Sequence, residues 1–198
     1  GIYYLSDREE NLEGAIENAN IARKTMKGGA EYCRVYESRM RRQREKEKEV
    51  LSQFQDNLTN GRFQVYIQPK FLLSKFELFG GEALVRLQKQ DGSLEPPGVF
   101  IPILEKSGYI VELDFYMYEQ ILMYMKRWQK ERKWIPVISV NFSRSHFEKD
   151  GIYNRILKLT KQYQIDPGQI EIEITESLFV LGYDLVKSEV QMLREAGF

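Results

Sequence analysis

From residue 63 to the end of the chain, short segments typical of β-strands alternate with segments typical of helices. Strands that alternate with helices favour parallel βα units, in which helices cover the faces of a sheet. The chain is therefore predicted to have an α/β fold whose strands are arranged as in a barrel. Strands are expected at Phe63–Gln68, Glu77–Leu87, Val137–Asn141 and Ile170–Thr175, and helices near Val99–Ser107, Asp114–Lys130, Ile152–Gln164 and Asp184–Ala196.

The first 49 residues have a different organisation. Residues 1–36 are predicted as strand, helix and strand, with β-type runs at Ile2–Leu5 and Tyr32–Tyr36. This is too little chain for an independent domain. Residues 37–49 mix basic and acidic side chains. A solvated linker helix is favoured here over a basic binding patch, because the acids neutralise much of the charge.

Composition excludes several classes of protein. The formal net charge is zero and 42% of residues are hydrophobic, so bulk charge gives no reason to expect nucleic acid or a membrane surface as a partner. No apolar run approaches the roughly 20 residues that span a bilayer, and no secretion signal is recognisable. Cys33 is the single cysteine, so a reducing, cytoplasmic location is expected. Because the chain starts at Gly1 and stops where a helix would lead into a strand, we expect a piece of a longer protein.

Three oxygen-bearing side chains lie where predicted strands end. They are Glu82, Asn141 and Glu173, and Arg86 follows Glu82 by four residues. In βα barrels the working residues stand at the carboxyl ends of strands. Two carboxylates and an amide carbonyl suit Mg²⁺, Mn²⁺ or Ca²⁺, and a guanidinium beside them suits a phosphate group. The pattern predicts metal-assisted phosphoester chemistry at one mouth of a barrel.

Each of these residues also has a simpler interpretation. A lone glutamate at a strand end is usually exposed or caps a helix, and Asn141 with Ser143 could cap the next helix. Glu176 could do the same. His146, the single histidine, is expected to pack or cap rather than to catalyse, and Cys33 is expected to be inert.

Five motifs in order resemble one family. Glu82-Ala83-Leu84-Val85-Arg86 resembles the signature of EAL domains, which are bacterial phosphodiesterases that hydrolyse the second messenger cyclic di-GMP. The other motifs that resemble the family are Ile67-Gln68-Pro69, Phe100-Ile101-Pro102 with Glu105 and Gly108, Val140-Asn141-Phe142-Ser143, and Glu171-Ile172-Glu173-Ile174-Thr175-Glu176-Ser177.

The resemblance implies a fold and roles for named residues. The fold implied is a TIM-like barrel of the EAL type whose first strand runs antiparallel to the others, incomplete in this chain. The activity implied is hydrolysis of cyclic di-GMP to linear pGpG in a site with two Mg²⁺ or Mn²⁺ ions. The matched positions are Glu82, Asn141 and Glu173 as metal ligands, Gln68 and Arg86 as contacts to the dinucleotide with Leu84 beside it, and Glu176 as the residue that steadies a loop near the metals.

The sequence also departs from the family pattern. Lys70 replaces an apolar residue after Gln68-Pro69, and Leu87 replaces a tryptophan. The family's Asp-Asp-Phe-Gly-Thr-Gly segment, its catalytic lysine and a further metal-binding glutamate would lie beyond Phe198. No catalytic base is therefore expected in this chain, and residues 50–198 are a little over half of a barrel of about 250 residues.

The N-terminal piece resembles a second family. Residues 1–36 are similar to the closing helix and strand of GGDEF (diguanylate cyclase) domains, which implies an upstream domain in the full protein. The expected organisation is a GGDEF-like remnant at 1–36, a linker helix at 37–49 and the N-terminal part of an EAL domain at 50–198.

The predicted function is that of a cyclic di-GMP phosphodiesterase in the intact protein, and activity of these 198 residues alone is left open. The alternative is an inactive EAL module that serves as a cyclic di-GMP receptor or as an interaction scaffold. An unrelated metal-dependent phosphatase is disfavoured by the five ordered motifs. A homodimer is expected from the family's habit, and any membrane anchor of the full protein would lie outside this segment.

Overall fold

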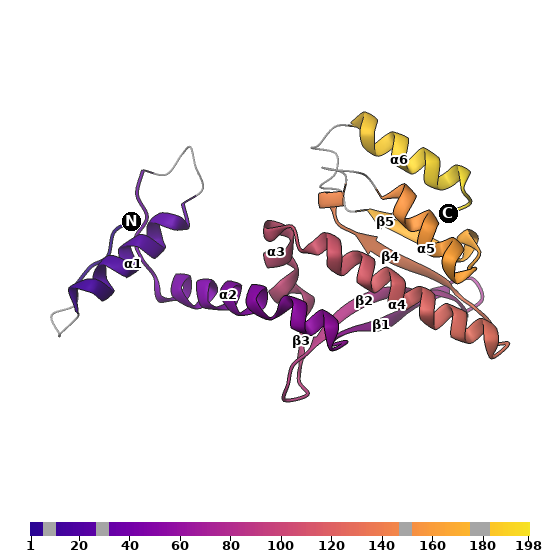
Figure 1. Cartoon of the computed structure of the whole chain (residues 1–198), viewed down its shortest axis with the longest axis horizontal. Helices are drawn as coiled ribbons and strands as arrows, with labels where there is room; N and C mark the ends of the chain where they lie inside the picture. The colour runs from indigo at the N-terminus through magenta and orange to yellow at the C-terminus, as the bar shows by residue number, and fades with distance from the viewer. Residues whose placement is uncertain (6–10, 27–31, 147–151, 175–182) are drawn as a thin grey trace. The chain divides into compact units, whose positions relative to one another are not determined.

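The computed structural model describes residues 1–5, 11–26, 32–146, 152–174 and 183–198 (Figure 1). The chain divides into two units, Gly1–Gln53 and Phe54–Phe198. Among the described residues, no helix is both long and apolar enough to span a membrane.

The first unit contains helix α1 (Leu12–Lys24) and most of helix α2 (Ser38–Thr59). Asn11 caps the N-terminus of α1, since its side-chain oxygen accepts a hydrogen bond from the Glu13 amide at 2.8 Å. Arg41 of α2 reaches back to α1, with Nη2 3.0 Å from the amide oxygen of Asn18. The prediction of two strands in this unit is wrong, because the described residues there form only an isolated bridge between Ile2 and Val35. The run at 37–49 is helical, but its helix continues to Thr59.

The second unit is built on one sheet. Its strands are β1 (Phe63–Leu72), β2 (Glu77–Gln88), β3 (Leu94–Glu95), β4 (Val137–Phe142) and β5 (Ile170–Ile174). The order is β1-β2-β4-β5, with the short β3 paired to β2. β1 runs antiparallel to β2, whereas β2, β4 and β5 are mutually parallel. The antiparallel first strand is the arrangement that the resemblance to EAL domains implies.

Helices lie between and after the parallel strands and cover one side of the sheet (Figure 1). They are α3 (Pro97–Ser107), α4 (Ile110–Lys130), α5 (Tyr153–Tyr163) and α6 (Tyr183–Glu195), with short 3-10 turns at Arg144–His146 and Pro167–Gln169. α3 ends at Gly108, whose φ of 80° lies in the left-handed region that glycine tolerates. All four helices predicted from the sequence are present.

The two faces of the sheet have opposite character because side chains alternate along each strand. One face is apolar and packs on α4 and α5; its buried residues include Ala83, Ile138, Val140, Phe142 and Ile170, against Phe115, Tyr118, Ile121, Leu122 and Met125. The other face carries polar side chains, namely Gln68, Lys70, Glu82, Ser139, Asn141, Glu171 and Glu173. The predicted metal ligands therefore lie on the face that the helices leave uncovered.

A close approach of two backbones requires glycine at position 80. A Cβ atom built on Gly80 would lie 2.3 Å from the carbonyl oxygen of Val137 in β4. A side chain at this position would push β4 away from β2. Gly80 thus permits the β2–β4 pairing that brings Glu82 beside Ser139.

Candidate metal and phosphate site

The three predicted ligands come from three neighbouring strands. Asn141 and Glu173 are paired across β4 and β5, each one residue before its strand ends. Glu82 is paired with Ser139 and lies within β2 rather than at its end. The predicted strand-end position of Glu82 is therefore wrong, because β2 continues six residues past it to Gln88. The sheet still places all three on its polar face.

Direct contact joins two of the three. The Asn141 Nδ2 atom donates a hydrogen bond of 2.8 Å to Oε1 of Glu82. Rotation of the amide would exchange its nitrogen and oxygen, so the carbonyl can face the same space as the carboxylate. Glu82 and Glu173 are half-buried and Asn141 is exposed, which leaves room for a ligand.

The donor set fits a hard divalent cation. Glu82 and Glu173 offer carboxylate oxygens and Asn141 an amide oxygen, the ligand types that Mg²⁺ and Mn²⁺ prefer. In the part of the chain that the structure describes, no three His, Cys, Asp or Glu side chains converge as a metal site. A site here would therefore need the amide oxygen of Asn141 as well as the two carboxylates.

Lys70 enters this site from β1. Its ammonium donates to Oε1 of Glu173 at 2.8 Å, to Oε2 of Glu171 at 3.1 Å, and to the hydroxyl of Ser139. Ser139 in turn donates to Glu171. Burial opposes the charge on Lys70, but its bonds to the two glutamates outweigh this effect and raise its pKa. The hydrogen bond from Ser139, assisted by Lys70, lowers the pKa of Glu171 against the opposing effect of burial.

In the sequence, Lys70 is visible only as a departure from a family pattern, and its contacts are not. A signal was available in the period of the strand, because Lys70 follows Gln68 by two residues and so shares its face. What the period could not give was the reach of the side chain across β2 to β4 and β5.

The predicted dinucleotide contacts form a second group beside the ligands. In the β1–β2 register Gln68 is paired with Glu82, Tyr66 with Leu84, and Gln64 with Arg86. The Arg86 guanidinium carbon lies 5.8 Å from the centre of the Tyr66 ring, and Nη1 donates to the Val85 carbonyl at 2.9 Å. Gln68 is exposed. The predicted contacts Arg86 and Gln68 therefore share the polar face with the ligands and offer one cation and one amide there.

Leu84 and Asn141 also border an apolar cavity of about 260 Å³ between the sheet and helices α3 and α4. Most of its lining is aliphatic, including Ile101, Leu113 and Met117. Its lining also includes Ile121, Val140 and Phe142 of the hydrophobic core.

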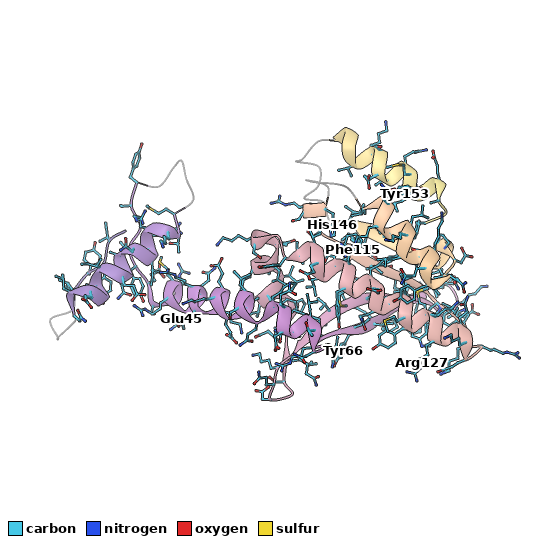
Figure 2. The ribbon with its side chains drawn as sticks, viewed as in Figure 1. Glu45, Tyr66, Phe115, Arg127, His146 and Tyr153 are labelled. Atoms are coloured by element: carbon cyan, nitrogen blue, oxygen red, sulfur yellow. The ribbon has the colours of Figure 1, made fainter. Side chains whose placement is uncertain are left out.

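A buried polar group anchors the chain just after Asn141. The Oδ2 atom of Asp114 in α4 accepts hydrogen bonds from the Ser143 amide and from Nε2 of His146, both at 2.9 Å. His146 is buried, and its ring centre lies 5.0 Å from that of Phe115 (Figure 2). Burial raises the pKa of Asp114, and the bonds from His146 and Ser143 only partly oppose this rise. The expected packing role of His146 matches this position.

Three other expectations concern a helix cap, Cys33 and Glu176. The capping function considered for the segment after β4 falls to Ser143, whose Oγ accepts from the Ser145 amide at 3.1 Å. Cys33 is exposed in the first unit. Glu176, expected to steady a loop, lies outside the described residues.

Residues 51–198 match the EAL domain family. Among curated relatives, the signaling protein YkoW of Bacillus subtilis is 29% identical over 140 residues, which cover 71% of this chain and 17% of YkoW. The bifunctional diguanylate cyclase/cyclic di-GMP phosphodiesterase MucR of Pseudomonas aeruginosa is 27% identical over 146 residues, 74% of this chain and 21% of MucR. The chain thus spans about a fifth of the length of these relatives.

Solved structures agree. The phosphodiesterase PaMucR in complex with c-di-GMP is 25% identical, with a TM-score of 0.69 over 75% of this chain and 60% of that one. The EAL enzyme Bd1971 with cAMP and cyclic di-GMP bound has a TM-score of 0.70 over 94% of this chain and 48% of that one, at 22% identity. These likenesses confirm the predicted α/β fold of the TIM-like kind.

Proposed function

Because the chain belongs to the EAL domain family, we propose that the intact domain hydrolyses cyclic di-GMP to linear pGpG with the help of a divalent metal ion. The observation that carries this proposal is the contact between Asn141 and Glu82 on the polar face of the sheet, with Glu173 paired to Asn141. Relatives that are named as cyclic di-GMP phosphodiesterases support it.

The ligand roles follow from the donor chemistry. Glu82, Asn141 and Glu173 would hold Mg²⁺ or Mn²⁺, and their two negative charges would offset the charge of the ion. A metal ion held by these residues would supply Lewis-acid chemistry, that is, polarisation of a phosphodiester and a lower pKa for a bound water. The family's two-ion site would draw its other ligands, and its lysine base, from residues outside this chain.

The substrate roles fall on the β1–β2 ladder. Arg86 presents a planar guanidinium with several N–H donors, which suits a phosphate or a guanine edge. The Tyr66 ring holds Arg86 on the polar face. Gln68 adds an exposed amide to the dinucleotide contacts and Leu84 lies beside them, and Glu176 steadies a loop near the metal.

The organisation of the full protein is also part of the proposal. Residues 1–36 are the remnant of a GGDEF-like domain, residues 37–49 a linker helix, and residues 50–198 the N-terminal part of the EAL domain. The division of the chain into units at Gln53 and Phe54, close to the start of the family match at residue 51, supports this boundary. The full protein works in the cytoplasm with an upstream GGDEF domain and as a homodimer.

A second candidate function has a specific observation in its favour. Lys70 already neutralises Glu173, one of the three proposed ligands. A module with this ion pair in place of a metal would bind cyclic di-GMP through Arg86 and Gln68 without cleaving it. It would then act as a receptor or scaffold.

One experiment separates the two candidates. The full-length protein is incubated with cyclic di-GMP and Mg²⁺ or Mn²⁺, and the products are resolved by chromatography. The enzyme forms pGpG, and chelation with EDTA or the substitution Glu82→Ala stops this reaction. Glu77→Ala at the exposed start of β2 is the matched control and keeps wild-type activity. A protein that binds cyclic di-GMP but forms no pGpG with either metal is a receptor.

A further inference from the structure

The ammonium group of Lys70 lies beside the carboxylates that are proposed to bind the metal ion. It contacts Glu173 and Glu171 of β5 and Ser139 of β4, all oxygen-bearing side chains. Both glutamates are within 4 Å of its nitrogen, so Lys70 counters two carboxylates at once. One of them, Glu173, is a proposed ligand.

The fold explains how a β1 residue reaches β4 and β5. The partner of Lys70 in β2 is Gly80, which has no side chain to block the path across the polar face. The β1–β2 register also shifts between Lys70 and Phe71, and such irregularities re-aim the neighbouring side chain. Strands lie about 4.8 Å apart, so a lysine side chain reaches past one strand only along an unobstructed path. The location of the Lys70 ammonium group is therefore determined by the pairing of β1 with β2.

We propose that Lys70 is an internal cation that competes with the divalent metal ion for Glu173 and so sets the metal concentration at which the site fills. This inference rests on the proposed function, because it takes Glu173 as a metal ligand. Oε1 of Glu173 accepts the hydrogen bond from Lys70, so an ion bound through that oxygen must displace the ammonium. An ion bound through the other oxygen still meets a positive charge close by.

Displacement of the Lys70 ammonium from Glu173 requires only a local movement of the side chain, because Lys70 has other hydrogen-bond partners. When it releases Glu173, its contacts with Glu171 and Ser139 remain available. Lys70 and Glu173 are 33% and 38% exposed, so water weakens their ion pair. A divalent ion with two carboxylates therefore outcompetes the ammonium, but at a higher concentration than it would need without Lys70.

The expected size of the effect follows from charge repulsion. A single and a double positive charge a few ångströms apart repel each other measurably even in water, and salt reduces that repulsion. Removing the charge of Lys70 should tighten metal binding about tenfold at low ionic strength. The gain should shrink as salt is added.

The test measures Mn²⁺ binding directly, without turnover. Free Mn²⁺ is titrated by electron paramagnetic resonance against the full-length protein and the variants Lys70→Met, Lys70→Gln and Lys70→Arg. Lys75→Met, in the turn between β1 and β2, is the matched control. Both neutral variants should bind Mn²⁺ about tenfold more tightly than wild type, whereas Lys70→Arg and Lys75→Met should match wild type. When Glu173→Gln is also present, the substitution Lys70→Met should increase Mn²⁺ affinity much less.

The outcomes distinguish a failure of the Lys70 competition from a failure of the proposed metal site. If wild type binds Mn²⁺ and Glu173→Gln weakens binding, but the neutral variants bind no more tightly than wild type, Lys70 does not compete and the inference is overturned. If neither wild type nor any Lys70 variant binds Mn²⁺ better than Glu173→Gln, the proposed metal site itself fails, and the inference fails with it. Agreement between the Met and Gln variants excludes an effect of one misfolded protein.

Discussion

The Asn141 Nδ2 atom lies 2.8 Å from Oε1 of Glu82, although 59 residues separate the two in sequence. The chain between them forms β3, α3 and α4 and then returns as β4 alongside β2. This crossover is what turns two isolated polar residues into neighbours. The parallel pairing of β2 with β4 is thus the structural basis of the candidate site.

The first prediction concerns Asn141. Asn141→Ala removes a proposed metal ligand whose amide donates to Glu82 and which is paired in register with Glu173, so Mn²⁺ affinity should fall by at least about the tenfold that loss of a supporting group costs a metal site. Asn154→Ala, an exposed asparagine in α5, is the control and should bind as wild type. Mn²⁺ titration of the full-length proteins measures both. Equal affinity of Asn141→Ala and wild type would remove Asn141 from the site.

The second prediction concerns Arg86. Arg86→Ala should raise the KM for cyclic di-GMP by about tenfold or more, because a charge-assisted contact to a phosphate is lost. Arg86→Lys keeps the positive charge but loses the planar guanidinium group, so its KM should lie between those of wild type and Arg86→Ala. Mn²⁺ affinity should not change in either variant.

The control for Arg86 is Arg127→Ala at the exposed last turn of α4, where the arginine pairs with Glu131 (Figure 2). Its KM should equal that of wild type. A KM unchanged in Arg86→Ala, with activity intact, would show that Arg86 does not contact the substrate.

The third prediction concerns pH and Asp114. Burial raises the pKa of Asp114 above its ordinary value of 3.8, so the folded state binds this proton more tightly than the unfolded state. The stabilisation that the proton supplies is complete below pH 3.8 and is lost as pH rises through the folded pKa. The free energy of unfolding of wild type should therefore fall, relative to Asp114→Asn, as pH increases above about 4.

Urea unfolding at a series of pH values measures this difference. Asp114→Asn is the suitable reference because asparagine is neutral throughout and keeps an oxygen for the Ser143 amide. A difference in unfolding free energy that does not change with pH, or that grows in favour of wild type, would contradict a raised pKa for the buried Asp114 carboxyl.

The fourth prediction concerns Gly80. Gly80→Ala places a Cβ against the backbone of Val137, so it should destabilise the sheet by about 1–3 kcal/mol, as other overpacked sites do. Gly98→Ala in α3 meets open space and should be neutral or stabilise by up to about 1 kcal/mol. Thermal unfolding of the two variants gives the comparison. Equal midpoints would show that β4 does not pass this close to β2.

Much of the second unit could be predicted from the sequence because its signals are local. The period of two in β4 and β5 and the helical spacing in α4 determine which side chains face the core. The family motifs added the antiparallel first strand, which periodicity cannot reveal. The strands expected near Ile2 and Val35 failed because a single bridge replaces them.

The site was harder to predict, because it depends on register and reach. The sequence predicts Glu82 at a strand end, whereas β2 continues to Gln88, because β1 pairs with it as far as Leu87 and β3 pairs with its last two residues. The ion pair of Lys70 depends on a path over Gly80 to residues about a hundred positions away. The Asp114–His146 bond likewise joins two helical segments whose contact no local pattern encodes.

The most direct test of the account is the Mn²⁺ concentration that gives half-maximal formation of pGpG from cyclic di-GMP by the full-length protein. Wild type should show a saturable dependence on Mn²⁺. Glu173→Gln, which keeps the shape of the side chain but not its charge, should shift the midpoint upward by at least about tenfold or abolish the reaction. A Glu173→Gln enzyme that forms pGpG with the wild-type midpoint and rate would contradict a metal site built on Glu82, Asn141 and Glu173.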